Sequence, residues 1–200
     1  MNENQSSLET LKEIAKRTGR EAVSSEIPYP SAAIHKVTYH RRTLYFPNNS
    51  YENSYFVCFA DSKEFGNHAV FSGVFFPIDI GSSTHMVIKN KDILDKINLF
   101  GKKKFLKTGI PSYDSRVLIK GNDAVAVKRL FGEKRMKNLI DHTLKLHPGI
   151  IVAINDADVN FVPGLKGKSN LGIFITREWI MEVDLIEKLF IIAEQFMLEP

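Results

Sequence analysis

The chain has 200 residues, of which 44% are apolar and 25% charged; this composition is typical of a globular protein and excludes a disordered, fibrous or collagen-like chain. A single cysteine, Cys58, excludes an internal disulfide and a cysteine-rich zinc site. No apolar run approaches the roughly 20 residues of a membrane helix, and no secretory signal is predicted at the N-terminus. We therefore expect one soluble domain over residues 1–200, located in the cytoplasm.

The N-terminal segment, residues 1–34, predicts one helix and a connector. Apolar residues recur at helical spacing between Ser7 and Thr18, which predicts a short amphipathic helix. Residues 24–34 hold Pro28 and Pro30, and we expect them to form an irregular connector.

Residues 35–90 predict a meander of strands. Three β-rich runs end near residues 46, 60 and 76, and polar turn clusters separate them. Residues 84–89 predict a fourth strand. Connections this short join antiparallel neighbours, because parallel strands need long crossovers.

Residues 91–200 predict helices interleaved with strands. Helical patterns cover residues 91–98, 122–131 and 133–146, with a linker over 101–112 and a strand over 115–120. Further on, residues 150–154 and 159–162 predict a hairpin, residues 171–175 a strand, and the remainder a terminal helix. The pattern favours an α+β fold with a mainly antiparallel sheet, an N-terminal helix, two or three central helices and a C-terminal helix.

The terminal helix carries a wide apolar stripe. Apolar residues from Val183 to Phe196 follow helical spacing, and Ile191 and Ile192 widen the stripe. Such a stripe indicates either a helix packed hard against a sheet or a helix that meets a partner, so a homo-oligomer formed through it is a second expectation.

Several local patterns imitate known sites but fail on spacing. Residues 164–169 end in the Gly-Lys-Ser of a phosphate-binding loop, but Val162 stands where the motif needs glycine. Residues 156–160 imitate the start of a calcium loop, but its later glycine and glutamate are absent, so we interpret them as a turn. The six histidines form no ligand pair on one helical face. We therefore predict no metal site and no cofactor.

The net charge of +4 is unevenly distributed. Residues 89–137 hold 14 Lys and Arg against 5 Asp and Glu, a balance of +9, whereas the preceding and following parts carry −1 and −4. Aromatic residues lie among these basic residues, so the stretch could bind phosphates and stack bases, or face anionic lipid, although a solvated helix face has the same pattern. The predicted anion-binding surface consists of Lys102, Lys103, Lys104, Lys107, Lys128, Arg129, Lys134 and Arg135.

Two functions from different classes follow. The preferred one is a non-catalytic binding or accessory domain whose basic surface meets an anionic partner: an acidic protein, nucleic acid or a membrane surface. The alternative is an enzyme whose site assembles only in the fold, around Asp114 and His142. A carboxylate beside lysines suits acid–base chemistry, but Asp114 could equally close a turn.

Short motifs in the middle of the chain resemble an uncharacterised bacterial family, a domain of unknown function. They are residues 71–76, Thr108-Gly109, Tyr113-Asp114 and residues 117–123, and the resemblance covers roughly residues 70–198. A tyrosine at 113 replaces the usual phenylalanine. In several members of that family the soluble domain follows transmembrane segments, which are not predicted here. The resemblance implies no catalytic residues.

Overall fold

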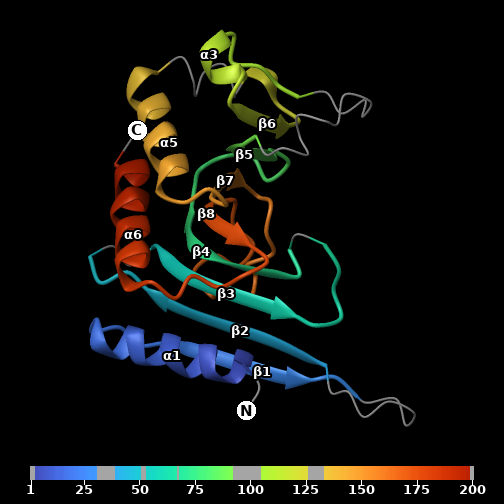
Figure 1. Cartoon of the computed structure of the whole chain (residues 1–200), viewed down its shortest axis with the longest axis vertical. Helices are drawn as coiled ribbons and strands as arrows, with labels where there is room; N and C mark the ends of the chain where they lie inside the picture. The colour runs from blue at the N-terminus through green and yellow to red at the C-terminus, as the bar shows by residue number, and fades with distance from the viewer. Residues whose placement is uncertain are drawn as a thin grey trace.

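The apolar runs of the sequence form the strands of one eight-stranded antiparallel sheet (Figure 1). Four helices accompany this sheet, so the described part of the chain has an α+β fold. The computed structural model describes residues 3–30, 39–50, 53–66, 68–91, 105–125 and 133–198. The strands are β1 (Val23–Pro28), β2 (His40–Pro47), β3 (Tyr55–Asp61), β4 (Val70–Pro77), β5 (Met86–Asn90), β6 (Val117–Gly121), β7 (Ile151–Ile154) and β8 (Asn170–Thr176). The helices are α1 (Glu3–Arg17), α3 (Pro111–Asp114), α5 (Lys134–Leu146) and α6 (Val183–Met197).

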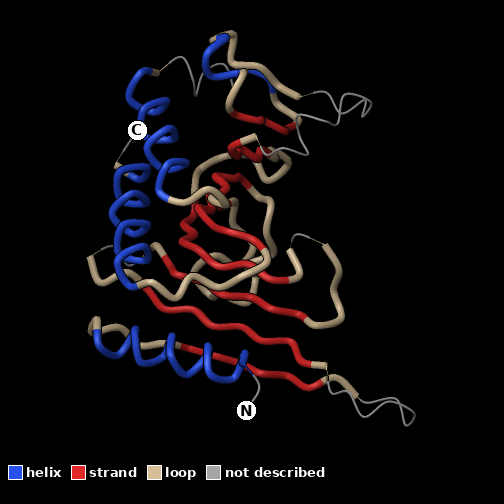
Figure 2. Tube along the Cα trace, viewed as in Figure 1, coloured by secondary structure: helices blue, strands red, loops and turns tan. Residues whose placement is uncertain are grey.

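The strand order across the sheet is β1-β2-β3-β4-β8-β7-β5-β6. The expected meander is confirmed, because β2, β3 and β4 are antiparallel neighbours joined by turns. Two later strands, β8 and β7, lie between β4 and β5, so the sheet mixes early and late segments of the chain. Figure 2 shows the strands stacked along the long axis of the molecule, with α5 and α6 to one side, α1 at one end and the short α3 at the other.

One face of the sheet is covered by helices. Buried side chains of α1, α5 and α6 form a single cluster with every second residue of the strands, such as Phe56, Ile88 and Ile173. The wide apolar stripe of α6 is largely accounted for by this packing, since α6 contacts both β4 and α5. Ile191 remains 54% exposed. A homo-oligomer through α6 stays a prediction.

The opposite face is covered only in part. The loop of residues 155–169 folds over the central strands, where Val162 and Leu165 pack with Phe71, Phe75 and Phe174 in a second buried cluster. Glycine makes room for these rings. A Cβ at position 172 would lie 2.4 Å from the ring of Phe75. No residue of β6 belongs to this cluster, and from β5 only the half-buried Val87 packs against it, so we call this side of the sheet the open face.

Three sequence predictions are corrected in the first and last thirds of the chain. Residues 24–28, part of the connector expected to be irregular, belong to the edge strand β1 (Val23–Pro28), in which proline is tolerated because Pro28 stands at its end. Residues 159–162 form a turn rather than a hairpin strand, and β7 pairs with β8 and β5 instead. The terminal helix, expected to follow directly after residue 175, begins at Val183.

The central helices also differ from expectation. Within the described residues α5 reproduces one of them in full, and the one-turn α3 lies at the end of the expected linker. The expected helix over residues 91–98 falls almost wholly outside the described residues, as does most of the one over 122–131. The side chain of Asn122 does not cap a helix. It binds the backbone of Ser83 and His85 and so ties the end of β6 to the approach to β5.

No helix in the described ranges combines the length and apolar character that crossing a membrane requires.

Candidate functional site: a basic pocket on the open face

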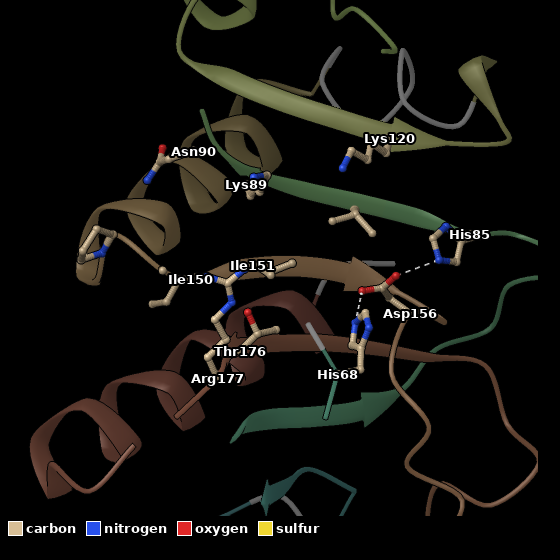
Figure 3. Close-up of a pocket in the computed structure, with 13 residues that line it drawn as sticks. His68, His85, Lys89, Asn90, Lys120, Ile150, Ile151, Asp156, Thr176 and Arg177 are labelled. Atoms are coloured by element: carbon tan, nitrogen blue, oxygen red, sulfur yellow. Dashed lines mark hydrogen bonds and ion pairs between the residues drawn. The ribbon is translucent and has the colours of Figure 1, made fainter. Parts of the chain in front are cut away.

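A pocket of about 530 Å³ lies on the open face, over the strands that the loop of residues 155–169 leaves uncovered (Figure 3). Its walls come from β5, β6, β7, the end of β8, the turns next to these strands and the turn before β4, which supplies His68. Val87 and Ile151 supply an apolar part of its lining. We call it the open-face pocket.

Strand register places two lysines in this pocket. Successive side chains of a strand point to opposite faces, so Val87 and Lys89 share the open face while Ile88 enters the helix-covered core. Lys120 on β6 lies directly opposite Val87 on β5. Lys89 and Lys120 belong to the basic stretch 89–137, but sequence alone does not give the register that brings them together.

Arg177 adds a third cation at the end of β8. Its backbone φ is 76°, a left-handed conformation that residues other than glycine rarely adopt. The backbone N–H of Arg177 donates to the carbonyl of Val70 at 2.7 Å, which holds the chain in this conformation. In Figure 3 the side chain extends toward Ile150 and Ile151. A strained residue that lines a pocket is a recognised mark of a functional site.

At the other end of the pocket, two histidines share one carboxylate. Nε2 of His68 lies 2.8 Å from Oδ2 of Asp156, and Nε2 of His85 lies 2.9 Å from Oδ1. A carboxylate only accepts hydrogen bonds, so each of these ring nitrogens carries the proton. The Asp156 side chain is only 12% exposed, whereas the histidines are 41% and 46% exposed. We call these three residues the His–Asp–His cluster.

Asn155 holds Asp156 in place. It has φ of 51°, the second left-handed non-glycine residue in the described chain. Its amide group donates to the carbonyl of Thr84, and its side-chain oxygen accepts from the backbone N–H of Asn170. The predicted turn at residues 156–160 therefore has a further role, because it begins by directing Asp156 to the two histidines.

Contacts within the cluster shift the pKa values of His68 and Asp156. The hydrogen bond to Asp156 raises the pKa of His68 above 6.5, its ordinary value, although partial burial acts in the opposite direction. Burial would raise the pKa of Asp156, but hydrogen bonds and charge from His68 and His85 outweigh it and hold this pKa below 3.8. Asp156 is therefore ionised across the physiological range.

The charges of the pocket are strongly unequal. Lys89, Lys120 and Arg177 line it together, and Asp156 is the only carboxylate among its described lining residues. The hydrogen bonds from two histidines occupy both oxygens of that carboxylate. The arrangement is suited to holding an anion between cationic side chains.

The residues predicted from the sequence to bind anions lie elsewhere. Lys102, Lys103, Lys104, Lys128 and Arg129 fall outside the described residues. Lys107, Lys134 and Arg135 are exposed, and none of the three lines the open-face pocket.

Asp114 and His142 do not join the pocket either. The carboxylate of Asp114 accepts hydrogen bonds from the backbone and hydroxyl of Thr108, at 2.9 and 2.8 Å, and from the backbone of Gly109. These bonds close the turn before α3. Burial would raise the pKa of Asp114, but these bonds lower it overall. His142 is exposed on α5. An enzyme site around the two residues stays a prediction.

The comparisons with known proteins give no further guide to this site. No family model matches the sequence, and no match was found among curated proteins or among solved structures. Within the ranges that the structure describes, no group of three or more His, Cys, Asp or Glu side chains could hold a metal ion.

Proposed function

We propose that the protein is a binding domain that holds an anionic group in the open-face pocket. One observation carries the proposal: β5, β6 and the end of β8 bring Lys89, Lys120 and Arg177 to a single hollow whose only described carboxylate is bonded to two histidines. Cationic side chains that line one hollow raise the local concentration of anions, which supports an anionic ligand.

The size of the pocket favours a small molecule or a single anionic group of a larger partner. Its volume of about 530 Å³ falls within the range of roughly 300–1,000 Å³ that is common for small-molecule sites. Val87 and Ile151 offer apolar contact beside the cations. A ligand with a compact anionic group and a short apolar or aromatic part could contact both the cationic and the apolar residues of the pocket.

Backbone strain at both ends of the pocket also favours a function. The two left-handed non-glycine residues in the described chain are Arg177, which lines the pocket, and Asn155, which precedes Asp156. Such conformations persist where the surrounding structure holds them, and they cluster at binding and catalytic sites. We retain the cytoplasm as the proposed compartment.

The test is a binding titration with pocket variants. Inorganic phosphate, short single-stranded nucleic acids and vesicles of anionic lipid would be titrated at low salt and again at increasing salt. We expect binding that weakens as salt rises, since exposed charge pairs are screened. Lys89→Gln and Lys120→Gln should each weaken it.

Two matched controls separate the pocket from general basicity. Lys168→Gln removes an exposed lysine of the neighbouring loop, and Lys134→Gln removes one from the surface predicted from sequence. Both should leave affinity unchanged. Equal losses in all four variants, or no binding at any salt, would contradict the pocket as the binding site.

A further inference from the structure

The charge of the His–Asp–His cluster depends on how many protons its two rings hold. With both rings neutral the cluster carries the single negative charge of Asp156. Protonation of one ring brings its charge to zero, and protonation of both brings it to +1. Histidine is the side chain whose ordinary charge change falls between about pH 5 and 8. Protonation of His68 alone, whose pKa is raised by Asp156, therefore makes this end of the pocket less repulsive to anions.

Protonation also creates hydrogen-bond donors. In each neutral ring the Nε2 proton faces Asp156, and Nδ1 is an acceptor. A proton added at Nδ1 converts it to a donor without disturbing the bond to Asp156. Both rings are about half exposed and line the pocket, so each new N–H can reach a ligand there.

Lys120 is the permanent cation nearest to this end by strand register. It lies opposite Val87, which is two residues, or about 7 Å, from His85 along the chain. Lys89 is four residues from His85, about 13 Å away. The His–Asp–His cluster and Lys120 thus define one subsite, and Lys89 lies toward the opposite end of the pocket.

Resting on the proposed function, we infer that this subsite takes a doubly charged oxyanion of the phosphate or sulfate type, and that the anion binds together with a proton on the His–Asp–His cluster. A tetrahedral oxyanion offers several acceptor oxygens to donors that converge from two rings and an ammonium group. An anion stabilises the protonated rings, and the protonated rings stabilise the anion to the same extent, because the coupling is reciprocal.

Other charged groups around the cluster set the background for this coupling. Glu64, in the turn after β3, adds a negative charge that raises the pKa of His68 together with Asp156. The ring of Phe174 on β8 lies against His68, with centroids 6.2 Å apart. Lys89, Lys120 and Arg177 are the cations of the pocket walls. A pH response that variants of the two histidines abolish arises from the cluster rather than from these cations.

Sulfate is the sharpest probe, since its own charge does not change over the range in which histidine titrates. Its affinity for the full chain would be measured by calorimetry between about pH 5.5 and about pH 8.5. We expect affinity to fall as pH rises, by up to about tenfold per pH unit for each proton taken up. Repeating the titration in buffers of different ionisation enthalpy should reveal proton uptake on binding.

Variants assign the effect to the cluster. The double variant with His68→Gln and His85→Gln keeps an N–H donor for Asp156 at each position but cannot take up a proton, so the pH slope should disappear. The single variant His142→Gln removes an exposed histidine of α5 and should keep it. Asp156→Asn removes the negative charge and should strengthen sulfate binding at about pH 8.5.

The outcomes separate this inference from the proposed function. Absence of sulfate and phosphate binding at every pH would overturn both. Binding that depends on Lys120 but shows no pH slope and no proton uptake would overturn the inference alone. Glycerol phosphate in solution and phosphatidate in vesicles carry the same chemical group, and the one with higher affinity identifies its source. Failure of both to bind at about pH 6.5 would contradict a phosphate-type ligand.

Discussion

The two faces of the sheet differ in how completely they are buried, although the same strands form both. On β5, Ile88 is fully buried beneath the helices, while its neighbour Val87 lies half-buried in the open-face pocket between two lysines. The helix-covered face is closed by apolar packing from β2 to β6. The open face is closed only in the middle, by the loop of residues 155–169.

Within one sheet, the helix-covered face therefore stabilises the fold, and the uncovered end of the open face carries the candidate site. Burial of apolar surface stabilises the helix-covered face, at roughly 25 cal/mol for each Å² removed from water. The uncovered end of the open face contributes less burial and presents Lys89, Lys120 and a shared carboxylate instead. Changes on the first face should therefore alter folding, and changes at the pocket should alter binding.

The largest expected effect comes from adding a side chain at Gly73, where β4 lies close to the backbone of β8. A Cβ at Gly73 would lie 2.2 Å from the backbone carbonyl oxygen of Ile173 on the neighbouring strand, which cannot move aside as a flexible side chain could. We expect Gly73→Val to cost more than about 4 kcal/mol or to prevent folding. Urea unfolding followed by circular dichroism measures this. Gly81→Ala is the control, because its nearest neighbours would be 3.9 Å away. Near-native stability of the valine variant would refute the packing described for β4 and β8.

A pair of adjacent substitutions compares the faces directly. Ile88→Ala should lower the free energy of unfolding by about 2–5 kcal/mol, because it leaves a cavity in a closed core. Val87→Ala should lower it by under about 1 kcal/mol, because solvent already reaches the pocket. Chemical denaturation of the two variants gives both values. Equal losses would mean that the open face is as closed as the other.

The His–Asp–His cluster should make stability depend on pH. The folded-state pKa of His68 is raised, so its contribution is complete below 6.5 and is lost as pH rises through the folded value. The folded-state pKa of Asp156 is lowered, so its contribution is complete above 3.8 and is lost as pH falls through the folded value. Stabilisation by the pair is therefore greatest between these two values.

Unfolding curves at about pH 5.5 and about pH 8.5 test this window. His68→Gln should lose more stability relative to the wild type at the lower pH, and His142→Gln should show no such difference. A larger loss at the higher pH would show that the sign of the coupling is wrong.

The smallest expected change in stability comes from the pocket lysines. Lys120→Gln should shift the free energy of unfolding by no more than about 0.5 kcal/mol, as is usual for substitutions that disturb no packing. The same variant should lose affinity for phosphate. Thermal unfolding with and without phosphate measures both, since a ligand that binds only the folded state raises the midpoint. A variant that loses stability without losing phosphate affinity would place Lys120 in the structural framework.

The fold class could be predicted because it depends on patterns among residues that are close together in the sequence. Strands and helices follow from the periodicity of apolar residues, and the meander follows from the short turns between its strands. Edge strand β1 was missed because its residues are mostly exposed and show little alternation. The hairpin at residues 159–162 was wrong because Val159 and Val162 are buried by loop packing rather than by strand pairing.

The pocket could be predicted only in part. The excess of basic residues over 89–137 pointed to the stretch that supplies Lys89 and Lys120, but the residues singled out were the dense clusters along the chain. His68, His85 and Asp156 are far apart in sequence and meet through the insertion of β8 and β7 between β4 and β5. No local pattern encodes that order. The turn residue Asn155 before Asp156 was the one nearby sequence signal.

The most direct test of the account is a phosphate titration at low salt that follows the backbone amide signals of the protein by NMR. Binding in the open-face pocket predicts saturable shifts concentrated at His85, Lys89, Lys120 and Arg177, with little change at Lys134 and Arg135. Shifts centred on Lys134 and Arg135, or weak shifts spread over all basic residues without saturation, would contradict the pocket as the functional site of this protein.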